Sequence, residues 1–290
     1  MYNISMKDFI RLIRPHHWVK NILIFFPIIF NSQLFIPELF TKAIWGFIAF
    51  CLAASAVYTV NDICDAEHDK KHSVKKDRPI ASGRVSKNSA AVLASVLVIG
   101  ALAVNAFISR SPLDWICLVS YLILNFAYSR GLKNVPILDV AVLVSGFLLR
   151  VVYGSAVTGT PISDWLWLTV ISAAFFFGLG KRRGEMAAET DSRTVLKSYT
   201  REFLDKNMYV TMACALVFYS LWTVDPATVA RMGTRNFVYT VPLVLVICMK
   251  YSLDCESKQS GDPVETVLRD KILIALIALY GAVTLAAIYL

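Results

Sequence analysis

An acidic cluster follows an apolar run without a break at residues 61–69, which read NDICDAEHD. On a helix, Asp62, Asp65 and Asp69 have the spacing i, i+3 and i+7, and Asn61 lies four residues before Asp65, so their oxygen atoms converge on one face. Such a face repels itself unless a cation binds there. Oxygen ligands without cysteine suit a hard divalent ion, and Mg2+ is usually held by one or two carboxylates while a substrate diphosphate fills its remaining positions.

Two interpretations of this cluster compete. A solvated acidic helix end would show the same pattern. The cluster lies at the end of an apolar run, however, and ionisable groups at a membrane boundary are usually retained for function. The sequence therefore predicts a Mg2+ site in which Asp62, Asp65 and Asp69 are both metal ligands and catalytic residues.

The composition indicates what kind of protein holds this cluster. Of 290 residues, 57% are hydrophobic and the mean hydropathy is +0.58, which is too apolar for a soluble domain and indicates a polytopic membrane protein. The net charge of +8 does not indicate nucleic acid, because Lys and Arg lie in short loops between apolar runs instead of forming one basic face. Anionic lipids and anionic substrates are the expected partners. The six cysteines are scattered and include no CxxC pair, so neither a disulfide framework nor a zinc site is indicated.

Apolar segments of spanning length must position the cluster. We count nine of them, at residues 22–38, 43–61, 89–109, 112–128, 136–157, 162–180, 208–224, 237–250 and 272–290. Residues 1–21 mix apolar and basic side chains, as an interfacial amphipathic helix would. The expected fold is therefore all-α, a single integral-membrane domain over residues 1–290 that forms a bundle of nine transmembrane helices.

Basic residues predict the orientation of this bundle. If the N-terminus is cytoplasmic, the segments on that side carry 24 Lys and Arg residues and the opposite loops carry four. This asymmetry predicts a cytoplasmic N-terminus and an outside C-terminus in the cell inner (plasma) membrane. The candidate catalytic loops at residues 62–88, 129–135, 181–207 and 250–271 would then all face the cytoplasm.

The loop after the acidic cluster reads RPIASG at residues 78–83. This loop, the NDxxDxxxD pattern at a helix end and the nine spans together resemble the UbiA superfamily of intramembrane prenyltransferases. Six further stretches resemble a narrower branch of it, the decaprenyl-phosphate phosphoribosyltransferases. They are RPHHWVKN (14–21), YSRGLKNVPILDV (128–140), GFLLR (146–150), GKRRGE (180–185), YTREFL (199–204) and GDPVE (261–265).

The resemblance implies an activity and its partners. Members of that branch are understood to move 5-phosphoribose from phosphoribosyl diphosphate onto a polyprenyl phosphate, with release of diphosphate. The acidic cluster would then hold the Mg2+-bound diphosphate of the sugar donor. The implied partners are these two substrates and the bilayer, with a homo-oligomer as an open alternative.

A second motif separates this chain from the aromatic prenyltransferases of the superfamily. Those enzymes carry another Asp-rich motif where this chain has Lys181, Arg182, Arg183, Gly184 and Glu185. Cations cannot ligate a metal ion, but they bind phosphate directly, Arg through a bidentate fork and Lys as a point charge. The difference suits an acceptor that is a phosphate monoester. The alternative is a positive-inside cluster without further function.

Several other residues are weaker candidates for substrate binding. Asp139 and Arg150 are eleven residues apart, near three helical turns, so they share a helix face. Arg150 at membrane depth must find a partner, which is either a substrate phosphate or a structural carboxylate. Lys20 either contacts substrate or extends its amine to the interface. The remaining candidates are Asn61, Arg78, Lys133 and Glu185.

Two other functions stay open from the sequence. The first is a prenyltransferase that moves a prenyl group from a prenyl diphosphate to an aromatic or other small acceptor, and the basic residues 181–183 argue against it. The second is a transporter. Transporters often show paired broken spans in two related halves, and we find no such repeat in the sequence.

Overall fold

The computed structural model describes residues 6–71, 75–109, 111–187, 194–257 and 262–289. Among these residues all regular structure is helical, which confirms the predicted all-α class. The chain divides into two compact units. Unit 1 comprises Met1–Pro27 and Ile36–Thr160, and unit 2 comprises Ile28–Phe35 and Pro161–Leu290. That the two units together form one integral-membrane domain stays a prediction.

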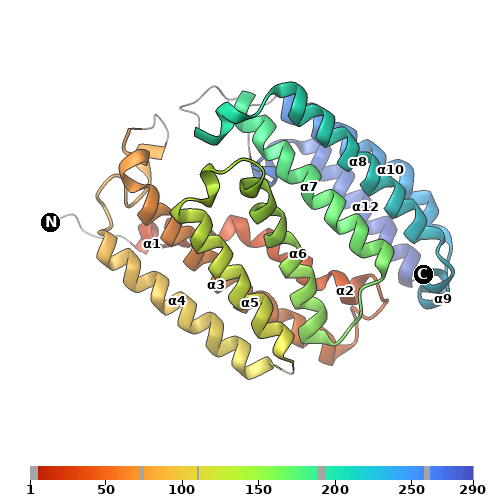
Figure 1. Ribbon diagram of the computed structural model, residues 1–290. Helices are drawn as coiled ribbons and strands as arrows, with labels where there is room; N and C mark the ends of the chain where they lie inside the picture. The colour runs from red at the N-terminus through yellow and green to blue at the C-terminus, as the bar shows by residue number, and fades with distance from the viewer. Residues whose placement is uncertain (1–5, 72–74, 110, 188–193, 258–261, 290) are drawn as a thin grey trace. The chain divides into compact units, whose positions relative to one another are not determined.

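Unit 1 consists of long helices joined by short connections (Figure 1). Its helices are α1 (Met6–Ile13), α3 (Pro37–Asp69), α4 (Lys87–Ile108), α5 (Pro112–Arg130) and α6 (Leu138–Thr158), with the 3-10 helices η1 (Pro15–Phe25), η2 (Lys75–Asp77) and η3 (Leu132–Asn134). Helices α3 and α4 lie side by side. The alanines Ala49, Ala53, Ala54 and Ala56 of α3 are buried, and such small side chains let neighbouring helices approach closely.

Aromatic side chains fill the core of unit 1. The Phe50 ring of α3 lies with its centroid 5.0 Å from that of Tyr121 on α5 and 4.7 Å from that of Tyr153 on α6. The buried Tyr153 hydroxyl donates a hydrogen bond of 2.6 Å to Asn105 on α4, so its polar end is satisfied. This packing fixes α5 and α6 against α3, the helix that carries the acidic cluster.

Local sequence signals set where these helices begin. Proline stands in the first turn of α3 and of α5, where a backbone amide needs no partner. Ser86 accepts a hydrogen bond from the Ser89 amide and caps α4. Ser111 and Asp114 form a capping box at α5. Helix α3 is 33 residues long and continues without a break through the acidic cluster.

Two long helices of unit 2 lie side by side, α7 (Asp164–Ala187) and α8 (Arg201–Val224) (Figure 1). The other helices are α9 (Pro226–Met232), α10 (Val241–Ser257), α11 (Pro263–Arg269) and α12 (Lys271–Tyr289), with the 3-10 helices η4 (Thr194–Ser198) and η5 (Asn236–Thr240). Trp222 of α8 is fully buried, and its ring lies 5.2 Å from both Phe30 and Phe237. A buried Trp of this kind is a large part of the apolar core of the unit.

A partly buried ion pair ties two helices of unit 2 together. The Lys250 ammonium of α10 lies 2.6 Å from Asp254 and 2.7 Å from Asp270. The second oxygen of Asp270 accepts hydrogen bonds from the amides of Ile272 and Leu273 and so caps α12. One carboxylate therefore starts α12 and holds it to α10.

The predicted span at residues 22–38 is not a continuous helix. The 3-10 helix η1 ends at Phe25, the four-residue helix α2 (Phe26–Ile29) follows, and the chain turns before α3. Pro27 lacks an amide hydrogen, and Ser32 has a φ of 56°, in the left-handed region, so a long right-handed helix cannot run through this segment.

The predicted count of nine spans is not confirmed. Seven helical stretches among the described residues are long and apolar enough to cross a membrane, namely α3, α4, α5, α6, α8, the stretch Asn236–Glu256 and the stretch Lys271–Ile288. The segment at 22–38 is missing from this set for the reason just given. Helix α7 is missing although it has 24 residues, because charged residues near both of its ends lower its hydropathy.

Candidate active site

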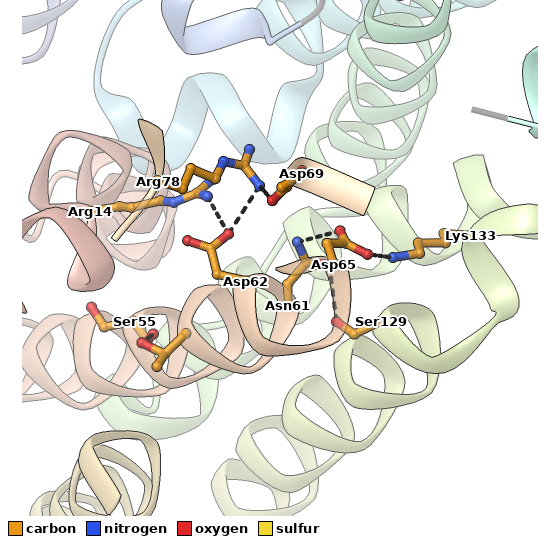
Figure 2. Close-up of polar contacts among 10 residues, drawn as sticks. Arg14, Ser55, Asn61, Asp62, Asp65, Asp69, Arg78, Ser129 and Lys133 are labelled. Carbon is orange, nitrogen blue, oxygen red and sulfur yellow. Dashed lines mark hydrogen bonds and ion pairs between the residues drawn. The ribbon is translucent and has the colours of Figure 1, made fainter. Parts of the chain in front are cut away.

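The acidic cluster occupies the last turns of α3, as its helical spacing predicted (Figure 2). Asp62 and Asp69 are buried, with 2% and 3% of their surface exposed, whereas Asp65 is half-buried. Burying a carboxylate is costly unless an opposite charge and hydrogen bonds compensate it. Three basic side chains from other segments of unit 1 supply that compensation.

Arg78, from the loop after α3, bridges two of the aspartates. Its Nη1 atom lies 3.1 Å from the Oδ1 atom of Asp62 and 2.7 Å from the Oδ2 atom of Asp69. Arg14, from the N-terminal segment, donates to the same Asp62 oxygen at 2.6 Å. Two guanidinium groups therefore meet two carboxylates at one position beside α3 (Figure 2).

Arg14 is a residue of the site that we did not predict. It lies directly before the 3-10 helix η1 and has a φ of 48°, an uncommon backbone conformation for a residue other than glycine. Its guanidinium carbon lies 5.3 Å from the centre of the Tyr58 ring. The signal in the sequence was a basic residue next to Pro15 in a stretch of the family resemblance, but nothing there indicated a contact with a helix 48 residues further on.

Asp65 faces a second group of side chains. Lys133, from η3, forms an ion pair with its Oδ1 atom. The Asn61 amide donates to its Oδ2 atom at 3.1 Å, and the Ser129 hydroxyl of α5 donates to Asn61 at 3.3 Å. The structure thus brings together three of the candidate residues, Asn61, Asp65 and Lys133. Ser129, which was not a candidate, lies beside them. Figure 2 shows that Asp62 and Asp65 point to different partners.

The charges of the site balance. Three carboxylates, of Asp62, Asp65 and Asp69, are matched by the three cations of Arg14, Arg78 and Lys133. The described residues contain no group of three or more His, Cys, Asp or Glu side chains that is already arranged to hold a metal ion. Asp62 and Asp69 share the Arg78 cation, whereas Asp65 contacts Lys133. The binding of one metal ion by all three aspartates stays a prediction.

The donor set nevertheless fits Mg2+. Asp62 and Asp69 present oxygen atoms to a single cationic atom, the Nη1 of Arg78, so one cation can reach both carboxylates. Mg2+ is commonly held by one or two carboxylates plus substrate phosphates and prefers hard oxygen ligands. A magnesium ion at this position would have to replace the arginine contacts.

The structure does not pair Arg150 with Asp139. Arg150 is 5% exposed and donates to Asn21 at 2.7 Å, to the Gly146 carbonyl oxygen at 2.5 Å and to the Tyr121 hydroxyl at 3.1 Å. All of these partners are neutral, so the structural carboxylate that we considered is not found among the described residues. Three helical turns keep two residues on one face but leave their side chains too far apart to touch.

Lys20 lies half-buried in η1, in a segment that is held against α3. The indole of Trp18 donates to Ser55 at 3.0 Å, and the Ser55 hydroxyl donates to the Ile13 carbonyl oxygen at 2.8 Å. These bonds fix the chain on both sides of Arg14. A contact of Lys20 with substrate stays a prediction.

The basic stretch at the end of α7 belongs to unit 2. Arg182 is fully buried and forms an ion pair of 2.5 Å with Glu185. Arg183 forms one of 2.7 Å with Asp205 of α8, and Lys181 is half-buried. Both arginines therefore have a carboxylate partner within their own unit. The sequence did not indicate that Asp205 would be one of these partners.

A shallow, open depression of about 620 Å3 lies beside the end of α5 in unit 1. Its lining residues are Ile123, Phe126, Ala127, Arg130, Gly131 and Leu132. Apolar side chains form most of the wall, and Arg130 adds one positive charge close in the chain to Lys133. Such a combination suits an amphipathic ligand with an anionic end.

Three comparisons place these features among known proteins. A model of the UbiA prenyltransferase family matches residues 24–268. The chain is 32% identical over 285 residues to the decaprenyl-phosphate phosphoribosyltransferase of Mycobacterium tuberculosis (strain ATCC 25618 / H37Rv), which covers 94% of this chain and 93% of that protein. It is 30% identical over 295 residues to the protein of the same name in Corynebacterium glutamicum, which covers 97% of this chain and 86% of that protein.

The solved structure of a UbiA homolog from Archaeoglobus fulgidus bound to GPP and Mg2+ superposes with a TM-score of 0.72, over 98% of this chain and 100% of that one. The two sequences are 18% identical, so this likeness supports the fold alone. It agrees with the helical architecture of both units.

Proposed function

This chain belongs to the UbiA prenyltransferase family, and we propose that within the family it transfers 5-phosphoribose from phosphoribosyl diphosphate to a polyprenyl phosphate, with release of diphosphate. The names of the two relatives reported above support this choice of substrates. The observation that carries it is the site at the end of α3, where three carboxylates and three cations lie together. Both signs of charge are needed to bind a diphosphate together with a divalent ion.

We propose that the donor binds at this site. Asp62 and Asp69, with Asp65 beside them, would hold Mg2+, which when bound neutralises the charge of the departing diphosphate. Arg14, Arg78 and Lys133 would hold the phosphate oxygens, the arginines through bidentate contacts. As the bond to diphosphate lengthens, C1 of the ribose gains oxocarbenium character. The protein contributes mainly the position of the groups and their electrostatics.

The acceptor needs little activation. A phosphate monoester is largely ionised at neutral pH, so its oxygen attacks C1 without a strong general base. Attack from the face opposite to the leaving diphosphate inverts C1 and yields a β-linked product. The open apolar depression beside α5 is a candidate place for part of the polyprenyl chain.

We propose that the acceptor phosphate is bound by Lys181, Arg182 and Arg183. The ion pairs of Arg182 with Glu185 and of Arg183 with Asp205 would then have to open or share the cation when phosphate arrives. Glu185 would in that case act on the substrate mainly through Arg182, by competing with the phosphate for this cation. Such an exchange of one anionic partner for another costs less than exposing an unpaired buried charge.

The remaining candidates would act around the donor. Asn61 orients Asp65 through its amide. Arg150 carries a buried positive charge whose bonded partners are neutral, which would favour an anionic donor nearby. Lys20 and the buried Asp139 are further proposed contributors. The site would face the cytoplasm from the inner membrane, with the N-terminus cytoplasmic and the C-terminus outside, as the distribution of basic residues predicts.

A transfer assay tests the proposal. Purified protein in detergent or nanodiscs is given phosphoribosyl diphosphate labelled in the ribose, Mg2+ and polyprenyl phosphates of several chain lengths. We expect label to move to the lipid fraction, one diphosphate to be released for each transfer, and the reaction to stop when the metal is chelated. Prenylation of an aromatic acid from a prenyl diphosphate, without any transfer of ribose, would refute the proposal in favour of the other activity of the family.

A further inference from the structure

We propose that Arg78 and Arg14 occupy the position of the divalent cation until the donor arrives, so that the metal ion and the diphosphate bind together and not the metal ion first. The inference rests on the proposed function in one respect, which is that a diphosphate bound to a divalent ion is the ligand of this site. It adds a role for Arg14 and an order of binding, neither of which follows from the sequence.

The contacts of Asp62 and Asp69 carry the first step. The Oδ1 atom of Asp62 accepts hydrogen bonds from both guanidinium groups, at 2.6 Å from Arg14 and 3.1 Å from Arg78. The Oδ2 atom of Asp69 accepts one of 2.7 Å from Arg78. One oxygen of each carboxylate is therefore already bonded to a cation in the structure.

The balance of charge carries the second step. Two carboxylates and two guanidinium groups leave no net negative charge at this position, and Asp65 is neutralised separately by Lys133. A free divalent ion would have to displace both arginines from these carboxylates without supplying them with another anion. Charge-assisted hydrogen bonds are about twice as strong as neutral ones, so this displacement is unfavourable.

A diphosphate removes that obstacle. It brings several negative oxygen atoms, to which the arginines can turn while the carboxylates turn to the metal ion. The side chains of Arg14 and Arg78 are 18% and 25% exposed, less buried than the 2% of Asp62, so it is the arginines that have room to move. Each cation then exchanges one anion for another, and no charge is left unpaired.

The test measures metal binding directly. Mn2+ serves as the probe because its free concentration can be read by electron paramagnetic resonance, and inorganic diphosphate stands in for the donor, with a correction for the Mn2+ that diphosphate binds in solution. In the unaltered protein we expect weak binding of Mn2+ alone and at least about tenfold tighter binding with diphosphate present. Linkage requires that Mn2+ tightens the binding of diphosphate by the same factor.

The direction in which Mn2+ affinity changes in the arginine variants decides the question. In Arg78→Gln, Mn2+ alone should bind at least about tenfold more tightly than in the unaltered protein, because its competitor is gone. The gain from diphosphate should shrink in the same variant. Arg14→Gln should change both quantities in the same direction by a smaller factor, since it bonds one carboxylate instead of two. Arg78→Lys keeps a competing cation and should stay closer to the unaltered protein.

Arg84→Gln is the matched control. Arg84 lies in the same loop, but it bonds Asp8 at 3.0 Å and the Asp77 carbonyl oxygen at 2.6 Å, not the aspartates of the site. The Mn2+ affinity of the Arg84→Gln variant should equal that of the unaltered protein. An arginine that only supports the fold would give the opposite sign, because its loss would loosen the site and weaken metal binding. Mn2+ affinity that is equal or weaker in both Arg78→Gln and Arg14→Gln, in folded protein, would overturn the proposal.

The result separates this inference from the proposed function. Tighter Mn2+ binding in Arg78→Gln without any transfer of phosphoribose by the unaltered protein would reject the donor named above and keep the exchange of cations. Transfer by the unaltered protein, with no gain in Mn2+ affinity in the variants, would reject the exchange alone.

Discussion

Gly154 of α6 lies directly against the backbone of Ile24 in η1. A Cβ atom added to Gly154 would come within 2.1 Å of the Ile24 carbonyl oxygen and 2.8 Å of its carbonyl carbon. Backbone atoms cannot turn aside as a flexible side chain can. The 3-10 helix η1 therefore depends on a residue without a side chain 130 positions later in the chain, and η1 is the segment that follows Arg14.

The close approach predicts a loss of stability on substitution. Gly154→Ala should push η1 away from α6 and lower the free energy of unfolding by about 1–3 kcal/mol, the usual cost of overpacking. Gly100→Ala is the control, because a Cβ there would meet only the Leu52 Cδ1 atom at 3.4 Å and alanine favours a helix. Thermal unfolding in detergent measures both. Equal melting temperatures for the two variants would contradict the contact.

The ion pair of Asp65 predicts a variant that folds but does not turn over. Asp65→Asn keeps the shape of the side chain and removes its charge, so the protein should stay folded and inserted in the membrane while transfer of phosphoribose is abolished. Glu67→Gln is the control on the same helix turn, since Glu67 is exposed and its ion pairs among the described residues are with Lys70 and Lys87. Near-normal Mg2+-dependent activity in Asp65→Asn would remove Asp65 from the site.

Sequence reasoning found the acidic helix because its information is local. The spacing of Asp62, Asp65 and Asp69 is a property of one helix, and α3 has that spacing. The partners of these residues are not local. Arg14 is 48 residues and Lys133 is 68 residues from the aspartate that each contacts, and only the packing of η1 and α5 around α3 brings them there. Lys133 was a candidate because it lies just before the apolar span at residues 136–157, where it could reach a diphosphate, and Arg14 was overlooked.

The fold was predicted in class but not in every element. Hydropathy located the long helices, because an apolar run of about twenty residues is itself the signal. It failed at residues 22–38, where Pro27 and the left-handed Ser32 interrupt an apolar run that composition alone cannot distinguish from a span. The position of Arg150 at membrane depth predicted that its charge must have a partner. The sequence did not indicate that Asn21, Gly146 and Tyr121 would be the partners.

The distribution of basic residues predicts the topology. Tags inserted near residues 75 and 190 should be accessible from the cytoplasm, and a tag near residue 230 should be accessible only from outside, because 24 Lys and Arg residues lie in the segments expected inside and four in those expected outside. Labelling of intact and permeabilised cells with an impermeant reagent measures this. As a control, each tagged protein must keep its transfer activity. The reverse pattern of labelling would mean that the site faces the other side.

The basic stretch of α7 predicts a selective loss of acceptor binding. Neutralising Lys181 and Arg182 together, as Lys181→Gln with Arg182→Gln, should lower kcat/KM for the polyprenyl phosphate by about ten- to hundredfold for each lost charge-assisted contact, about 1.5–3 kcal/mol. The effect on kcat/KM for phosphoribosyl diphosphate should be smaller. The ratio of the two effects is therefore the quantity to measure, with each substrate varied at saturation of the other.

The buried ion pair of Arg182 makes a structural control necessary, because removing one partner of such a pair destabilises a protein by itself. Glu185→Gln breaks the same pair and leaves the cation, so it should lower the melting temperature as the arginine variant does without weakening acceptor binding. Lys206→Gln removes an exposed cation of unit 2, paired with Glu202, and should change neither quantity. If the double variant and Glu185→Gln each lower kcat/KM for the two substrates by the same factor, the basic stretch supports the fold and the acceptor phosphate is bound elsewhere. A loss confined to the acceptor in the double variant would mean that Lys181 and Arg182 bind its phosphate.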